Sequence, residues 1–178
     1  MSEDPMSPER DGGAGMWPGE LEVHVAPGGP VEAALAWMEL LRTGRLADAW
    51  LRMDNPFRLY LARYWCWRHH FPLSDAGYEP FDVATGLADD GPVHPVWPAF
   101  ARSQTPDVSP EQIFSGGWLA AGAPEPAGPD LEIVRLTPAN RDLAGDDAPF
   151  TLVLRLATSG WLVAGHGETP ARPRWPPG

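Results

Sequence analysis

The chain contains no lysine, since all 13 of its basic residues are arginine. This absence excludes Schiff-base chemistry at a lysine and the phosphate-contacting lysine of a P-loop. The single cysteine, Cys66, excludes an intramolecular disulfide and indicates a reducing compartment. Long apolar runs are also missing, because no stretch approaches the ~18 residues of a membrane span. We therefore expect a cytoplasmic protein that does not interact with membranes.

Acidic residues are in excess, and the formal net charge is −11 at pH 7. A charge of this sign opposes binding to nucleic acid and to anionic membranes, so neither is expected as a partner. Residues 42–70 nevertheless contain six arginines against two aspartates, whereas residues 71–149 contain 13 acidic residues against three arginines. The favoured interpretation is ion pairing between these two segments. The other is an arginine-rich groove for an anionic ligand.

The length of 178 residues fits a single domain with tails. Residues 1–29 are acidic and rich in Gly and Pro, which predicts a disordered tail, although a short strand over Leu21–Val25 is an alternative. We predict one domain over residues 30–168. Residues 169–178 form a Pro-rich C-terminal tail.

Apolar spacing predicts two helices directly after the N-terminal tail. Pro30 opens the first, and Val31–Arg42 repeats apolar residues at positions i, i+3, i+4 and i+7. Thr43-Gly44 is expected to end it, with glycine in the left-handed conformation. A second, shorter helix is predicted over residues 46–53. Core packing is the favoured explanation for the Trp and Met stripes of both helices.

A third helix, from Asp54 to Phe71, carries the densest aromatic pattern of the chain. Asn55 is placed to cap it, with Pro56 at its first position. At 100° per residue it has apolar residues on two opposite sides, which predicts that it is held between the leading helix pair and the terminal hairpin. The larger face consists of Phe57, Tyr60, Leu61, Tyr64, Trp67 and Phe71, and the smaller face of Leu59, Ala62 and Cys66.

The middle of the chain is rich in Gly, Pro and Asp. Pro72–Pro95 is predicted to be a long loop, which is either a lid or binding loop or a partly disordered segment. A short helix is predicted over residues 96–102, with Trp97 and Phe100 facing inward. Ser109–Phe114 resembles another helix start, with serine as the cap.

The C-terminal third changes to the two-residue period of strands. Candidate strands are Trp118–Ala121, Leu131–Thr137 and residues 150–156. Ser159-Gly160 is predicted to form a two-residue turn that pairs Thr158 with Trp161. Helices followed by an antiparallel sheet predict a segregated α+β fold. One face of this hairpin is expected to carry the side chains of Leu154, Leu156, Trp161 and Val163.

Two segments resemble the NTF2-like superfamily, which includes SnoaL-like and ketosteroid-isomerase-like proteins. EAALAWMELLRTGRLADAWLRM resembles its opening helix pair, and TLVLRLATSGWLVAG its closing strands. The resemblance implies N-terminal helices packed in the concave face of a curved antiparallel sheet, as a cone with a blind pocket. It also implies a homodimer through the outer face of the sheet. Residues 72–130 depart from the family pattern, so a reduced sheet is an alternative.

The candidate catalytic residues all belong to the third helix. Asp54, held against aromatic rings, is suited to act as a general base, with Tyr64 as a hydroxyl donor and His70 as an alternative base. A purely structural role is favoured for these residues. In that interpretation Asp54 caps the helix or pairs with Arg58, and the tyrosines belong to the core. An aromatic pocket would instead be lined by Tyr60, Tyr64, Trp65, Trp97 and Trp161.

The histidines do not form a metal-binding pattern. His69 and His70 are adjacent, so their side chains diverge by about 100° on a helix, and His94 and His166 lie far from them in sequence. We therefore predict neither a metal nor a cofactor. His166 follows the last strand and is expected at the rim of the sheet or in an exposed loop.

Three hypotheses for function follow. The favoured one is a non-catalytic NTF2-like module that binds a small apolar ligand or a protein partner through its pocket or sheet face. The alternative is a cofactor-independent SnoaL-like isomerase, cyclase or hydrolase acting on a hydrophobic small molecule, so catalysis is left open. In the third, the acidic tail folds back over the arginine-rich helices.

Overall fold

The computed structural model describes residues 26–104, 117–139 and 150–174. In these ranges the helices are α1 (Pro30–Arg42), α2 (Leu46–Leu51), α3 (Asn55–Arg68), α4 (His70–Asp75), α5 (Pro80–Asp90), the 3-10 turn η1 (Gly91–Val93) and α6 (Trp97–Gln104). The strands are β1 (Trp118–Ala120), β2 (Glu125–Gly128), β3 (Leu131–Pro138), β4 (Phe150–Ala157) and β5 (Gly160–His166). The α+β class is thereby confirmed.

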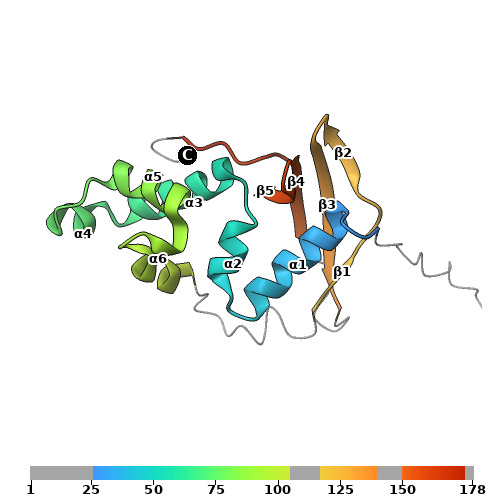
Figure 1. Cartoon of the computed structure of the whole chain (residues 1–178), viewed down its shortest axis with the longest axis horizontal. Helices are drawn as coiled ribbons and strands as arrows, with labels where there is room; N and C mark the ends of the chain where they lie inside the picture. Colours follow the sequence, from blue (N-terminus) through green and yellow to red (C-terminus); the bar gives the residue numbers. More distant parts are fainter. Residues whose placement is uncertain (1–25, 105–116, 140–149, 175–178) are drawn as a thin grey trace, which may run out of the picture.

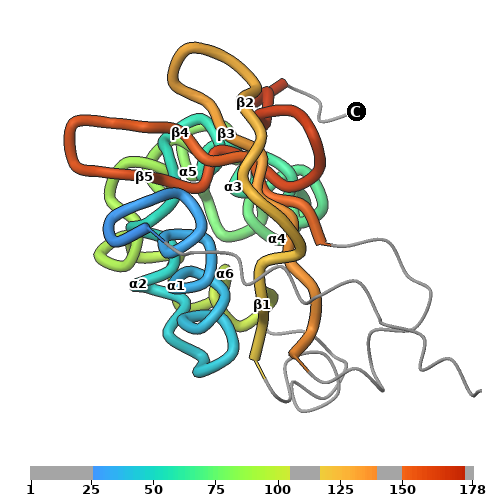
Figure 2. Tube along the Cα trace, turned by 90° about the vertical axis from the view of Figure 1, so that its right-hand side faces the viewer, coloured from blue at the N-terminus to red at the C-terminus, as the bar shows by residue number. Residues whose placement is uncertain are grey.

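The strands form one antiparallel sheet in the order β1-β3-β4-β5, with β2 also paired to β3. Figure 1 shows the sheet at one end of the molecule and α3 to α6 at the other, with α1 and α2 between them. Seen from the sheet side in Figure 2, α3 and α5 lie behind the strands. Helix α1 packs against β1, β3, β4 and β5. The strand residues buried in the core are Val134, Leu136, Leu152, Leu154 and Val163.

Local signals account for the first helices. Pro30 occupies the first position of α1, and Gly44 follows its end with a φ of +70°, as predicted. Helix α2 ends two residues earlier than predicted. Asp54, rather than Asn55, caps α3, since its Oδ1 accepts a hydrogen bond of 2.9 Å from the backbone N–H of Phe57.

The C-terminal half of the larger aromatic face is exposed, contrary to the prediction. Phe57 is buried, but Tyr64 and Trp67 are 44% and 43% exposed. Helix α5 packs along α3, and only the N-terminal part of α3 reaches β5. The smaller apolar face is therefore the one that α3 buries, with Ala62 and Cys66 inaccessible. The expectation that α3 is held between the first helix pair and the hairpin is wrong for most of its length.

Residues 72–95 are largely helical, which corrects the predicted loop. Pro80 lies at the first turn of α5, where a missing N–H costs nothing. Gly86 interrupts the helical pattern in the sequence. Packing favours glycine at this position, because a Cβ there would lie 2.7 Å from the ring of His94. The buried stripe of α5 consists of Val83, Ala84, Leu87 and Ala88.

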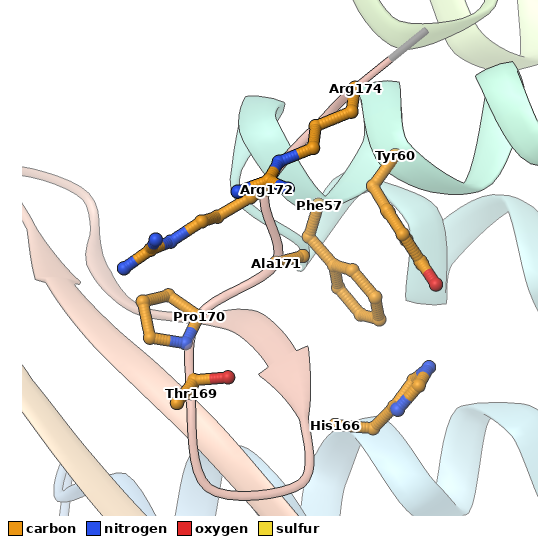
Figure 3. Close-up of a pocket in the computed structure, with 8 residues that line it drawn as sticks. All are labelled: Phe57, Tyr60, His166, Thr169, Pro170, Ala171, Arg172 and Arg174. Atoms are coloured by element: carbon orange, nitrogen blue, oxygen red, sulfur yellow. The ribbon is translucent and has the colours of Figure 1, made fainter. Parts of the chain in front are cut away.

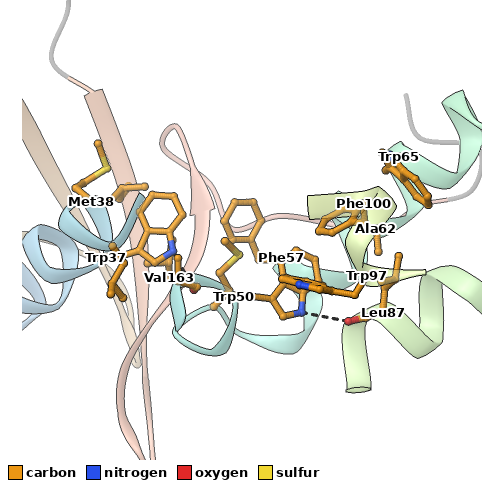
Figure 4. Packing of buried hydrophobic residues seen from close by; sticks show 14 of the residues in the cluster. Trp37, Met38, Trp50, Phe57, Ala62, Trp65, Leu87, Trp97, Phe100 and Val163 are labelled. Carbon is orange, nitrogen blue, oxygen red and sulfur yellow. Dashed lines mark hydrogen bonds between the residues drawn. The ribbon is translucent and has the colours of Figure 1, made fainter. Parts of the chain in front are cut away.

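Two indole groups connect the sheet end to the helical end. Trp37 Nε1 on α1 donates to Ala49 O on α2 at 3.2 Å. Trp50 Nε1 donates to Leu87 O on α5 at 3.1 Å, and Figure 4 shows this bond inside the core. The Trp50 ring also meets Trp97 and Phe100 of α6 edge-on, at centroid distances of 5.5 and 4.9 Å. The inward placement predicted for both α6 residues is confirmed.

The terminal hairpin forms with a different register. Leu156, not Thr158, pairs with Trp161, so the turn lies one residue earlier than predicted. This two-residue shift in pairing keeps the four residues named in the prediction on one face of the sheet. Leu154 and Val163 are buried, whereas Leu156 is exposed. The weak strand signal at residues 118–121 is confirmed by β1, while the predicted elements at 21–25 and 109–114 lie outside the described residues.

None of the helices in the described ranges has the length and apolar character needed to span a bilayer.

Candidate functional site

A β-bulge orients a histidine at the end of β5. The pairing shifts between Val153 and Leu154, so that His166 faces Leu152 across the strands. Opposed residues of an antiparallel pair point to the same side of the sheet, and the extra residue of a bulge re-aims the side chains that follow it. His166 thereby faces α3, and its ring lies 5.8 Å from that of Phe57 and 6.4 Å from that of Tyr60, between centroids.

Residues 167–174, which we call the C-terminal strap, cross from β5 toward α3 (Figure 1). Two backbone bonds hold the strap on the sheet: Gly167 N–H donates to Thr151 O at 2.9 Å, and Ala171 N–H donates to Ala164 O at 2.8 Å. At its far end, Pro173 O accepts a bond of 3.1 Å from Arg63 Nη1 on α3. The strap therefore bridges the two ends of the molecule.

Gly165 allows the strap to lie close to the sheet. A Cβ at this position would come within 2.9 Å of Ala171 N and 3.0 Å of Thr169 O. Both of these are backbone atoms, which cannot move aside as the tip of a side chain can. The close approach of two backbones is a common reason for glycine in a strand.

The strap encloses a surface hollow of about 430 Å³, shown in Figure 3. Phe57 and Tyr60 of α3 and His166 of β5 face it from the body of the protein. Arg172 and Arg174 line it from the strap. Among the described residues, no carboxylate lies within 4.0 Å of either guanidinium group. The hollow thus combines aromatic surface with unpaired positive charge.

The five residues predicted to line one aromatic pocket lie apart. Tyr60 lines the strap hollow, and Tyr64 is exposed one turn farther along α3. Trp65 lines a second hollow of about 370 Å³ between α3, α4 and α6. Trp97 is buried in the core, and Trp161 lines a third hollow of about 320 Å³ beside the start of α1.

The three candidate catalytic residues are also dispersed. Asp54 is 4% exposed, and both of its carboxylate oxygens are engaged, Oδ1 by the cap and Oδ2 by Arg155 Nε at 3.1 Å. Tyr64 lies ten residues along α3, about 15 Å away at the helical rise. His70 is exposed, with Nδ1 2.8 Å from Trp67 O. The capping role of Asp54 is confirmed, and its ion-pair partner is Arg155 rather than Arg58.

Within the described ranges, no group of three or more His, Cys, Asp or Glu side chains is arranged to hold a metal ion. Cys66 is inaccessible, and burial raises the pKa of its thiol to about 12. A thiol with such a pKa is protonated at neutral pH, so Cys66 is a core residue rather than a nucleophile.

The arginines of the strap hollow were missed from sequence, because residues 169–178 had the composition of a tail. The available signal was the pair of arginines in Ala-Arg-Pro-Arg, which is unusual in so acidic a chain. The position of His166 at the sheet rim agrees with one of its two expected placements. Its orientation toward α3 depends on the bulge, which has no local signature in the sequence.

The outer face of the sheet carries charged groups. Arg135 on β3 forms an ion pair with Glu125 on β2, and its Nη2 lies 3.6 Å from Glu168 Oε1. Such a surface is more polar than the core of a typical homodimer interface. The homodimer through this face remains a prediction.

Comparisons with protein-family models, with curated proteins and with solved structures find no match to this chain.

Proposed function

We propose that the protein is a non-catalytic binding module that holds a small amphipathic acid in the strap hollow. The apolar part of the ligand would lie against the half-buried ring of Tyr60, which the buried Phe57 ring supports, and its anionic group would bind Arg172 and Arg174. The observation that carries this proposal is the arginine pair beside an aromatic surface, in a protein whose net charge is −11.

The physical chemistry of the hollow supports this ligand class. A guanidinium group binds carboxylate or phosphate through two parallel hydrogen bonds, so two guanidinium groups with no carboxylate partner among the described residues favour an anion. The aromatic rings favour a ligand with an apolar body. The volume of about 430 Å³ lies within the range of small-molecule sites.

An NTF2-like origin is part of the same proposal. The order of helices followed by an antiparallel sheet supports it, as does a helix packed against one face of that sheet. Binding sites of this superfamily lie between helices and sheet, and the strap hollow lies between α3 and β5.

The alternative proposal is a cofactor-independent isomerase, cyclase or hydrolase. Because both oxygens of Asp54 are engaged, such an enzyme would have to use His166 as its acid or base, with Tyr60 as a hydroxyl donor. The presence of both groups in one hollow is the observation that favours it.

Calorimetric titration tests the binding proposal. Octanoate and phenylacetate are expected to bind, whereas octanol and octylamine, which lack the anionic group, are not. The variant carrying both Arg172→Gln and Arg174→Gln should lose at least tenfold in affinity. Arg102→Gln, an exposed arginine of α6 that does not line the hollow, is the matched control and should bind as the wild type does.

Equal affinity for octanol and octanoate, or no binding of either acid, would contradict the proposal. NMR spectra of the bound acid over several hours separate the two functions. An unchanged ligand supports a binding module, whereas conversion that is lost in His166→Gln supports the enzyme.

A further inference from the structure

Three aromatic side chains form an exposed stripe away from the strap hollow. Tyr64 and Trp67 are 44% and 43% exposed on α3, and Phe71 at the start of α4 is 72% exposed. The ring centroids of Tyr64 and Trp67 lie 6.5 Å apart, and Phe71 follows in the first turn of α4, after α3 ends at Arg68. We call these three residues the aromatic stripe. Exposed large aromatic side chains that lie near one another mark an interaction site more often than scattered single residues do.

Two arginines of α3, Arg63 and Arg68, are sequence neighbours of the stripe residues, and Arg63 Nη1 donates to Pro173 O at 3.1 Å. The Arg68 guanidinium lies 5.9 Å from the Tyr64 ring centroid, and that of Arg63 lies 4.9 Å from the ring of Phe81. Within the described residues, neither arginine has a carboxylate within 4.0 Å.

The arginines of the preceding helices differ in this respect. Arg42 forms an ion pair with Glu39, and Arg45 forms one with Asp48. In each pair the two residues are three positions apart in the sequence. The pairing predicted between the arginine-rich and acidic segments is therefore absent at Arg63 and Arg68 in the described part of the chain. Positive charge is left beside the exposed rings.

We propose that the aromatic stripe binds the N-terminal segment of the same chain, residues 1–25. This segment has the complementary charge, with six acidic residues against one arginine. It also contains apolar residues that can pack on aromatic rings, among them Met16, Trp17 and Leu21. Carboxylates beside Arg63 and Arg68, with an apolar side chain over Trp67, would satisfy both features of the surface.

Tethering and charge favour this occupant over a second copy. Two copies of a chain with a net charge of −11 repel each other. A tethered segment acts at an effective concentration in the millimolar range. Fully extended, 25 residues span up to about 80 Å. The site lies outside the strap hollow, so this inference does not depend on the proposed ligand.

A spin label on the full chain tests the contact. The label is attached at Ala14→Cys, while the inaccessible Cys66 stays unlabelled. The NMR signal of the Trp67 indole N–H, assigned with Trp67→Phe, is expected to lose at least half of its intensity through proximity to the label. Sodium chloride at ~0.5 M, where the Debye length is only a few ångströms, should restore most of it.

Two sets of substitutions make the test specific for charge. Changing the six acidic residues of the segment to their amides should restore the Trp67 signal. Exchanging the same six residues between Asp and Glu keeps the charge and should leave the signal weakened. Phe71→Glu, which adds a negative charge to the stripe, should also restore it. The six positions are Glu3, Asp4, Glu9, Asp11, Glu20 and Glu22.

A signal that keeps its full intensity in the labelled wild type would overturn the proposal. Weakening that persists in the amide variant would also overturn it. In a mixture of labelled unenriched chains with unlabelled isotope-enriched chains, weakening of the Trp67 signal would identify a second copy as the occupant, against the proposal.

Discussion

Asp54 and Arg155 form an ion pair of 3.1 Å that joins the start of α3 to β4. Beside it, the segment before α3 extends the sheet by two backbone bonds of 2.9 Å, from Asp54 N–H to Val163 O and from Val163 N–H to Arg52 O. Arg155 also pairs with Asp130 at 3.1 Å. The junction of the helical end with the sheet thus rests on a buried carboxylate and covers the free edge of β5.

We expect the charge of Asp54 and its helix cap to contribute separately to the stability of the protein. Asp54→Asn keeps an oxygen for the cap but loses the charge, and should lower the free energy of unfolding by about 1–2 kcal/mol. Asp54→Ala also loses the cap and should cost about 2–4 kcal/mol in total. Urea denaturation followed by circular dichroism measures both. Asp48→Asn, which removes an exposed ion pair with Arg45, should change stability by less than ~0.5 kcal/mol.

Gly91 is expected to be required by the Trp50 indole. Its φ is +54°, and a Cβ there would lie 2.9 Å from Trp50 Cδ1. Gly91→Ala should therefore cost about 2–4 kcal/mol, from backbone strain together with displacement of a buried ring. Gly77 also has a positive φ, +80°, but open space around it. Gly77→Ala should cost only ~1 kcal/mol, and equal losses in the two variants would refute a role for Trp50.

Gly165→Ala should displace the strap without unfolding the domain. The added methyl group would meet backbone atoms of Thr169 and Ala171. We expect faster hydrogen exchange at the Ala171 amide, which bonds Ala164 O, and at least tenfold weaker binding of octanoate. Gly122→Ala, where the added group would meet open space, should change neither quantity. Unaltered exchange at Ala171 in Gly165→Ala would show that the strap tolerates the methyl group.

The buried thiol of Cys66 should make stability fall at alkaline pH. Burial raises its pKa to about 12 from the ordinary value of 9.0. Between these values the unfolded chain loses the proton that the folded chain keeps, so the free energy of unfolding falls by up to ~1.4 kcal/mol per pH unit, and the full contribution is present below pH 9.

Comparison with Cys66→Ala isolates this contribution from other alkaline titrations. The stability difference between wild type and variant should shrink as the pH rises from 9 to 10.5 in urea denaturation experiments. A difference that does not depend on pH would contradict the assigned cause. Labelling with a thiol reagent at pH 8 should in addition be limited by unfolding of the native protein.

Several elements could be predicted because their signals are local. A proline at the first position and a glycine past the last turn delimit α1, and strict alternation over Phe150–Ala157 identifies β4. The aromatic residues of α6 were placed correctly by their spacing. Helix α5 was missed because its one internal glycine and several acidic residues outweighed an apolar stripe that only a neighbouring helix makes visible.

The candidate site was predictable only in part. Tyr60 was selected for its aromatic ring, but apart from Phe57 its neighbours in the hollow come from residues more than 100 positions away. A local pattern cannot show which distant segment crosses a helix end, nor that a bulge turns His166 toward it. The free energy that selects these contacts is shared among many long-range packing interactions.

The amino-acid sequence by itself determined the α+β class, the ends of α1, the helical nature of α3 and the terminal hairpin. Each follows from periodicity and capping within a few residues, where the chain samples its conformations locally. Tertiary structure decided which side of α3 is buried, because both sides are apolar and the choice depends on α5. It also decided the path of the strap and the partner of Asp54, since backbone approach and ion pairing across 101 residues arise only once the chain is packed.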